Sequence, residues 1–203
     1  MPTDGFPGFK YASKVSCVLS THFAFFSFTS SNYVTPSDPP YTFYVRKHNP
    51  LIIYDSVANV AERSARHRNF NDFATDVNAS VIPQWLFVTP NLVDDAHDTN
   101  VTYAAAWLDY WLLPLLNDTR FNDNRTLILL TCDENETQNE NNNIFSLLLG
   151  GAVPQNLRGT VDSTYYTHYS ALSTVENNWG LGSLGRGDTN KSVFHIFSLF
   201  HKR

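Results

Sequence analysis

The chain has 203 residues, of which 42% are hydrophobic and 14% aromatic, values typical of a globular domain with a substantial core. It carries 14 Lys and Arg residues against 19 Asp and Glu residues, a net charge of −5. This balance gives no electrostatic reason to expect a nucleic acid or an anionic membrane as a partner. No apolar run approaches the roughly 18 residues of a transmembrane segment, and composition leaves the oligomeric state open.

Six Asn-x-Ser/Thr sequons predict N-glycosylation in a secretory route, because chance would give roughly three or four in so Asn-, Ser- and Thr-rich a chain. They begin at Asn78, Asn100, Asn117, Asn124, Asn135 and Asn190. The first residues lack the basic and apolar segments of a signal peptide. Either the chain is cytosolic with accidental sequons, or its natural N-terminus lies outside this sequence. Cys17 and Cys132 permit at most one intramolecular disulfide.

Taken in chain order, residues 1–40 form an N-terminal segment whose composition is unlike that of the rest of the chain. Within it, residues 15–37 are rich in Phe, Ser and Thr, nearly uncharged, and show neither helical nor strand periodicity. Residues 51–55 predict a short strand, and residues 56–66 predict a helix with Ser56 as its N-cap. Residues 69–78 fit either a helix or a loop.

Regular alternation follows from residue 81 onward. Strands are predicted at 81–90, 126–132 and 144–149, and helices at 103–116 and 168–179. Pro90 ends the first strand, and Gly180 ends the last helix. Trp107, Trp111 and Leu115 form one stripe of the first helix. Alternating strands and helices predict an α/β fold with a parallel central sheet.

Two adjacent carboxylates, Asp133 and Glu134, follow directly on the strand predicted at 126–132. In an α/β fold, ligands and metals bind at the C-terminal ends of the strands. Neighbouring anions also repel each other unless a cation, proton or basic group lies between them. The pair is therefore a candidate site for a divalent metal ion of the kind used in hydrolysis, with a solvent-facing loop as the alternative.

Three histidines are candidates for ligand contacts. His97 lies in an acidic loop with Asp95, and is either a metal or phosphate contact or part of a solvated loop. His168 is predicted in the first turn of a helix, where free N–H groups favour an anionic substrate, although its tyrosine neighbours equally fit a packing role. His48 belongs to a basic run that fits either phosphate attraction or surface charge.

Ordered blocks of residues spread over 41–188 carry a family resemblance. The blocks are 44–50, 89–91, 95–99, 133–137, 145–154, 166–170, 178–181 and 184–186. Together they resemble the C-terminal half of fungal secreted acid phosphatases in the phosphoesterase family, which includes phospholipase C-like enzymes and belongs to the alkaline phosphatase superfamily. The resemblance implies an alkaline phosphatase-like sheet flanked by helices, with residues 41–193 as part of that domain and 194–203 as a divergent tail.

The same resemblance implies hydrolysis of small phosphomonoesters at acidic pH, at a divalent-metal site, through a phosphoryl-enzyme intermediate on a serine. By position, Asp133 and Glu134 match the acid pair that binds the metal, whose identity the sequence leaves open. His97 and His168 match the catalytic histidines of the phosphate and metal pocket. The implied substrate contacts are His48 and Asp95. A phospholipase C-like phosphodiesterase and a non-catalytic truncated product are the alternatives.

Two features depart from the family pattern. The N-terminal half, which carries a Glu-Asn metal-ligand pair and the serine nucleophile, has no counterpart in this sequence. We therefore expect an incomplete sheet and weak or absent activity for the chain alone. Residues 15–37 match nothing in the family, and Val15 and Ser16 can be encoded by a consensus splice donor. We predict that this tract is a translated intron, absent from the dominant transcript.

Overall fold

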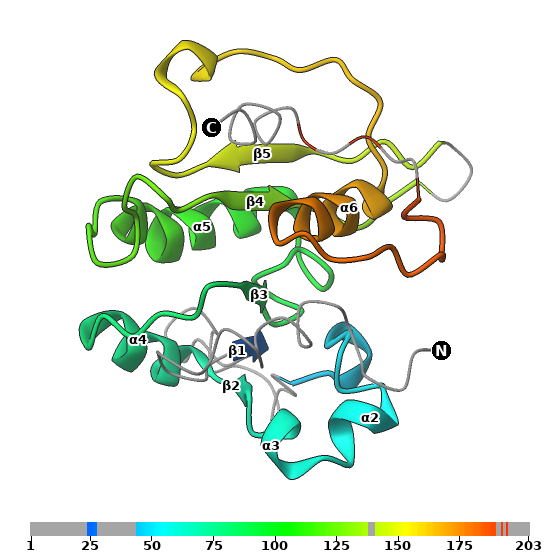
Figure 1. Ribbon diagram of the computed structural model, residues 1–203. Coiled ribbons are helices and arrows are strands. Elements are labelled where there is room, and N and C mark those ends of the chain that lie inside the picture. Colours follow the sequence, from blue (N-terminus) through cyan, green and yellow to red (C-terminus); the bar gives the residue numbers. More distant parts are fainter. Residues whose placement is uncertain (1–23, 28–43, 138–140, 190–191, 193, 195–203) are drawn as a thin grey trace. The chain divides into compact units, whose positions relative to one another are not determined.

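The computed structural model describes residues 24–27, 44–137, 141–189, 192 and 194 (Figure 1). The chain divides into two compact units, Met1–Phe121 and Asn122–Arg203, each with its own sheet. The mixed helix and strand content confirms the predicted α/β class at this coarse level. In the part of the chain that is described, no helix combines the length and apolarity needed to span a membrane. Cys17, Asn190 and most of the two atypical terminal segments lie outside the described residues.

The sheet of the first unit has three parallel strands in the order β2-β1-β3. They are β1 (Ala24–Ser27), β2 (His67–Arg68) and β3 (Leu86–Thr89). The middle strand, β1, lies inside the 15–37 tract, which showed no strand periodicity. Strands of parallel sheets are commonly buried on both faces, and they then read as continuous apolar runs instead of alternating ones. The missing periodicity therefore did not indicate a missing strand.

Short helices connect β1 to β2, where two sequence predictions are wrong. They are the 3₁₀ helix η1 (Arg46–His48), α2 (Asp55–Ala58) and α3 (Ala61–Ser64). The strand predicted at 51–55 is instead a turn closed by a hydrogen bond from Tyr54 N to Leu51 O, because only Leu51 is buried while Ile53 is 53% exposed. The predicted helix at 56–66 is interrupted at Asn59 and Val60, and Tyr54 takes the N-cap position in place of Ser56.

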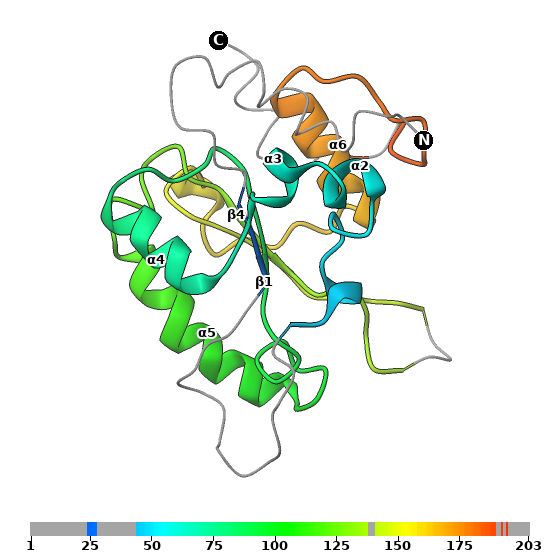
Figure 2. The same ribbon diagram turned by 90° about the horizontal axis from the view of Figure 1, so that it is seen from below.

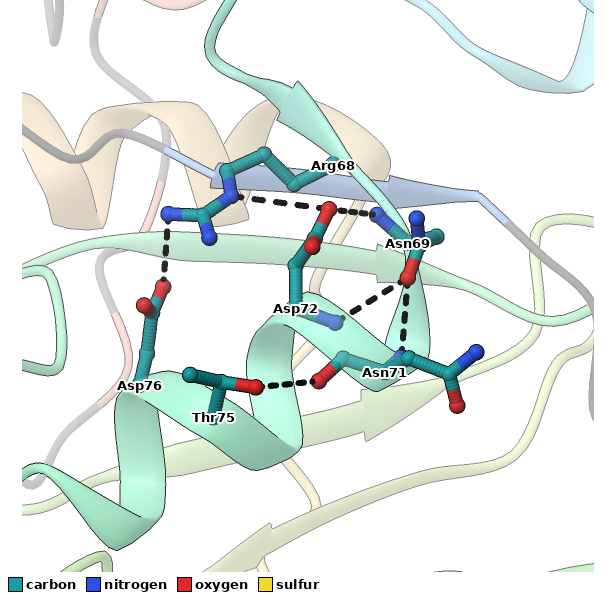
Figure 3. Close-up of polar contacts among 6 residues, drawn as sticks. All are labelled: Arg68, Asn69, Asn71, Asp72, Thr75 and Asp76. Carbon is teal, nitrogen blue, oxygen red and sulfur yellow. Dashed lines mark hydrogen bonds and ion pairs between the residues drawn. The ribbon is translucent and has the colours of Figure 1, made fainter.

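Residues 69–78 adopt the helical alternative, as α4 (Phe70–Asn78) (Figure 3). The Asn69 side chain accepts hydrogen bonds from two first-turn N–H groups at 2.9 and 3.0 Å, and Asp72 accepts one from the Asn69 N–H at 3.3 Å. This capping box satisfies N–H groups that the helix itself leaves without partners. Arg68, at the end of β2, donates to the buried Asp76 at 3.0 Å and so ties the strand to the helix.

An aromatic core joins α4 to α5 (Val101–Leu116), and the two helices lie side by side in Figure 2. Its buried members are Phe70, Phe73, Val77 and Trp107, packed against Trp111, Leu115 and Phe121, among others. Trp107 and Trp111 stack with ring centroids 5.2 Å apart. The predicted tryptophan stripe is confirmed, and β3 is confirmed for the second half of the range predicted at 81–90.

The sheet of the second unit is an antiparallel pair, β4 (Ile128–Thr131) and β5 (Ser146–Leu149), at the two positions predicted. Within the described residues β4 pairs only with β5, so the expectation that it is a central parallel strand is wrong. After β5, Gly150 has φ +102°, and a Cβ there would lie 2.4 Å from Thr126 O. This close approach requires glycine.

The predicted helix at 168–179 is confirmed as α6 (His168–Asn178), which Trp179 caps before Gly180 at φ +62°. A 3₁₀ turn, η2 (Gln155–Leu157), lies between β5 and α6. The buried side chains of α6 are polar: Ser170, Ser173, Thr174 and Glu176. A small apolar cluster around Val153 and Phe194 completes the interior of this unit.

Candidate functional site

The first unit brings together three of the predicted site residues, His48, Asp95 and His97. His48 Nδ1 lies 3.6 Å from Asp95 Oδ2, and the His97 backbone N–H donates to Asp95 Oδ1 at 2.8 Å. The two imidazole rings meet edge to face with their centroids 5.1 Å apart. Residues 49 positions apart in sequence thus form a single cluster, which we call the His48–Asp95–His97 cluster.

Burial shifts the carboxyl group of Asp95 in this cluster, and that of the neighbouring Asp94, toward neutrality. It raises the pKa of Asp95, against the hydrogen bond from His97 N–H and the charges of the two histidines. It also raises the pKa of Asp94 to about 6, with the Asn91 amide opposing the shift and the charge of Asp95 adding to it. Both acids therefore bind a proton at a higher pH than an ordinary aspartate does, and protonation removes negative charge that would otherwise repel an anionic ligand.

Two buried residues that precede Asp95 and His97 in the chain, Asn91 and Asp94, were not assigned a role from the sequence. Asn91 and Asp94 are only 2% and 1% exposed. The side-chain amide of Asn91 donates to Asp94 Oδ2 at 2.8 Å. The available signal was the position of an asparagine directly after a strand and a proline, where Asn side chains often bond to the backbone of a following turn.

The second unit brings His168 to the acid pair. His168 Nε2 lies 2.6 Å from the backbone carbonyl of Asp133. A carbonyl oxygen only accepts hydrogen bonds, so Nε2 is the donor, and in the neutral ring Nδ1 is left as an acceptor. Asn142 Nδ2 also donates to this carbonyl at 3.0 Å, while its Oδ1 accepts from Asn135 N–H at 2.7 Å. The backbone of the acid pair is therefore held from two sides.

The side chains of Asp133 and Glu134 are both exposed, and neither has a hydrogen-bond or ion-pair partner among the described residues. Their oxygens are donors that suit a hard divalent cation. In neither unit do the described residues include a group of three or more His, Cys, Asp or Glu side chains with a geometry that could hold a metal ion. Since protein-bound cations take four or more ligands, this pair can form only part of a metal site.

Five of the six predicted glycosylation sites lie among the described residues. Four of these asparagines are exposed: Asn78, Asn100, Asn117 and Asn124. Asn135 is half-buried, and its Nδ2, the atom that would carry a glycan, donates to Asn141 O at 3.0 Å. Nδ2 of Asn117 likewise donates to a backbone carbonyl, Leu113 O, at 3.0 Å. Glycan attachment is therefore sterically easier at Asn78, Asn100 and Asn124 than at Asn117 or Asn135.

Comparison with known proteins shows the family. The model of the phosphoesterase family matches residues 9–182, and this chain belongs to the phosphoesterase family. An acid phosphatase of Aspergillus fumigatus is 45% identical over 97% of this chain and 38% of its own length. A probable acid phosphatase of Kluyveromyces lactis is 50% identical over 75% of this chain and 36% of its own length.

A phosphate-repressible acid phosphatase of Penicillium chrysogenum is 49% identical over 75% of this chain and 37% of its own length. The resemblance that the ordered blocks indicated is thereby confirmed. The chain spans less than two fifths of the length of these three relatives. No solved structure matches it significantly.

Proposed function

We propose that this chain carries part of a phosphoric ester hydrolase, an acid phosphatase-type enzyme that hydrolyses small phosphomonoesters with the help of a divalent metal ion. The observation that carries the proposal is the His48–Asp95–His97 cluster, which joins two imidazoles and a carboxyl group in one place. The three fungal relatives reported above are named acid phosphatases, which supports the same reaction class. They favour a monoester substrate over the diester of the phospholipase C-like alternative.

The proposed roles follow from the chemistry of each group. His48 and His97 bind phosphate oxygens, while Asp95 orients the His48 ring and holds the backbone of His97. His168 has its ring fixed by the bond from Nε2 to the Asp133 carbonyl, which orients the opposite nitrogen for hydrogen bonding or proton transfer. Asp133 and Glu134 would hold the cation, which when bound neutralises phosphate charge and polarises the P–O bond.

Acidic conditions suit the proposed phosphate site. Because burial raises the pKa values of Asp94 and Asp95, both acids bind protons at a higher pH than ordinary aspartates do. The site therefore becomes less negative as the pH falls through about 6, and its attraction for a phosphate anion increases.

The proposal extends to the setting of the whole protein. We propose an alkaline phosphatase-like α/β domain, in an N-glycosylated protein that is secreted or associated with the cell wall. The exposed sequon asparagines support glycosylation, and the mixed α/β architecture supports the fold. Enzymatic deglycosylation of the native protein, followed by mass spectrometry, tests the proposed N-glycosylation. Asn124 is expected among the modified sites.

The metal part of the proposal is tested first by binding, which does not depend on turnover. The purified chain is titrated calorimetrically with Mg²⁺, Ca²⁺, Mn²⁺ and Zn²⁺ in turn. We expect at least one of these cations to bind, and the double variant Asp133→Asn/Glu134→Gln to abolish that binding. Glu136→Gln is the matched control, because Glu136 is an exposed acid of the same loop. Absence of binding, or equal loss in the control, would contradict the assignment.

The reaction part is tested by turnover of a phosphomonoester and a phosphodiester. Activity toward p-nitrophenyl phosphate and bis(p-nitrophenyl) phosphate is compared at acidic pH, with and without the bound cation. We expect any turnover to be metal-dependent, greater for the monoester, and lost in Glu134→Ala and His168→Ala. Preference for the diester would favour a phospholipase C-like enzyme. A folded, metal-bound chain that turns over neither substrate would favour the non-catalytic alternative.

A further inference from the structure

Asn91 is a buried polar residue in the first unit that lies outside the apolar core. Its Oδ1 accepts hydrogen bonds from the backbone N–H groups of Val93 at 2.9 Å and Asp94 at 3.0 Å. Its Nδ2 donates to Asp94 Oδ2 at 2.8 Å, and its backbone carbonyl accepts from Asp94 and Asp95 at 3.0 Å each. Both polar atoms of the side chain therefore bind Val93 or Asp94, which lie four and three residues before His97.

The loop that Asn91 organises has a strained backbone at the cluster itself. Ala96, between Asp95 and His97, has φ +78°, a conformation that residues with a Cβ rarely adopt. Farther along, the Thr99 hydroxyl donates to Val93 O at 2.6 Å and closes the loop. A strained residue of this kind persists only where the surrounding contacts hold it in place. The hydrogen bonds of the 91–99 loop therefore determine where His97 lies.

The amide group of Asn91 has a specific partner in Asp94. The other carboxyl oxygen of Asp94, Oδ1, is buried and has no hydrogen-bond partner in the described part of the chain. Loss of the Asn91 Nδ2 donor would leave the buried carboxyl of Asp94 without a side-chain partner. A carboxylate at position 91 would also place two acids side by side in a buried setting, where like charges repel strongly.

We propose that Asn91 is a positioning residue, whose amide holds the 91–99 loop so that Asp95 and His97 meet His48 in a geometry that binds phosphate. The ligand in this proposal rests on the proposed function, since phosphate is the anion assigned there to the His48–Asp95–His97 cluster. Asn91 acts through Asp94 and the loop backbone and does not touch the ligand.

The test compares Asn91→Asp with the parent chain in two measurements. The first is the nuclear Overhauser effect between the His48 and His97 rings, whose edge-to-face contact makes it observable without any ligand. The second is the affinity for inorganic phosphate by NMR titration. We expect Asn91→Asp to lose the ring-to-ring effect and to bind phosphate about tenfold more weakly, as expected for a lost charge-assisted hydrogen bond. Asn91→Ser, which keeps a turn-forming acceptor but lacks the amide donor, should behave in the same way if Asn91→Asp does not fold.

A reversal of the pair provides the rescue. In the double variant Asn91→Asp/Asp94→Asn, the donor and the acceptor exchange places, and the hydrogen bond is restored with a single carboxylate. We expect this variant to recover the ring-to-ring effect and most of the affinity. Failure of the rescue in a folded double variant would overturn the assignment to the amide–carboxyl pair.

The matched control is Asn69→Asp, which makes the same change at another asparagine whose Oδ1 accepts from two backbone N–H groups, beside the acid Asp72 (Figure 3). We expect it to leave both measurements unchanged. Equal losses in this control, or an unchanged Asn91→Asp, would overturn the positioning role. If the parent chain binds no phosphate, the proposed ligand is wrong, whereas loss of the ring-to-ring effect in Asn91→Asp would still support the positioning of the cluster.

Discussion

The two units differ in what fills their interiors. The first unit buries an aromatic cluster of Phe70, Phe73 and Trp107 with Trp111 packed against it. The second unit buries mostly polar groups along α6, together with Asp188 from the loop that follows. Apolar packing does not depend on protonation, whereas buried carboxyl groups do. We infer that pH acts on the stability of the second unit more directly than on the aromatic core of the first.

The largest expected effect is the removal of the aromatic core. Trp107→Ala deletes a side chain that is 2% exposed, and we expect it to lower the free energy of unfolding of the first unit by about 3–5 kcal/mol. Hydrogen exchange at the amides of α4 and α5 measures the loss where it occurs. Leu113 lies on the same helix and is 51% exposed, so Leu113→Ala is the control and should change hydrogen exchange little. A loss below about 1 kcal/mol for Trp107→Ala would contradict the importance of this core.

The next effect concerns the acid pair of the second unit, Glu176 and Asp188. Burial, together with the adjacent Asp188 carboxyl, raises the pKa of Glu176 from its ordinary 4.5 to about 7. Although burial alone would raise the pKa of Asp188, hydrogen bonds from Ser183 Oγ and from the N–H groups of Leu184 and Arg186, each 2.6 Å, hold it well below its ordinary value. The pair therefore keeps one acid protonated beside one that is ionised.

The sign of the resulting pH dependence follows from proton binding. Between pH 4.5 and about 7 the folded state keeps a proton on Glu176 that the unfolded state releases, so stability falls as the pH rises through this window. The contribution of Asp188 is present above its ordinary pKa of 3.8 and is lost below that pH. We therefore expect the second unit to be most stable in mildly acidic solution, between these two ranges.

Glu176→Gln tests this dependence, because glutamine has the shape of the protonated acid and cannot ionise. We expect the variant to remove the loss of stability between pH 4.5 and 7, a difference on the order of 2 kcal/mol at neutral pH. Hydrogen exchange at the α6 amides, followed across this pH range, is the measurement. Glu136→Gln, at an exposed acid of the same unit, should leave the slope unchanged. A slope that persists in Glu176→Gln would assign it to other groups.

The smallest expected effect comes from the two non-glycine residues with positive φ. Ser80 lies at a helix end, and Ala96 lies in the His48–Asp95–His97 cluster loop. Ser80 has φ +56° directly after α4, where Val81 N–H binds Asp76 O at 3.0 Å in the usual helix-ending pattern. Ser80→Gly and Ala96→Gly each relieve a left-handed residue, and we expect each to raise stability by up to about 1 kcal/mol. Thermal unfolding measures this gain.

The same two variants should differ in their effect on the proposed phosphate site. Ala96→Gly gives freedom to the backbone that fixes His97, so we expect weaker phosphate binding. Ser80→Gly lies at the end of α4 and should leave that affinity unchanged. Equal affinities for Ala96→Gly and the parent chain would show that the strained turn is not needed to hold the cluster.

The sequence by itself determined the elements with strong local signals. The tryptophan stripe predicted α5, the glycine after residue 179 marked the end of α6, and the two apolar runs predicted β4 and β5. Ordered blocks of residues also indicated the phosphoesterase family, which the family model and the similar proteins confirm. These features depend on side chains that are close in sequence, or on a linear order of motifs, and both can be read without coordinates.

Long-range partners were decided only by the tertiary structure. No sequence pattern indicated that β1 pairs with strands more than 40 residues away, or that β4 has an antiparallel partner in place of a parallel sheet. It also identified His48, Asp95 and His97 one by one, without their contact. Pairing and clustering depend on chain reversals and on hydrogen bonds between distant segments, whose free energy is not encoded in any local pattern. The buried amide of Asn91, which holds the loop at this cluster, became recognisable only once its partners were in place.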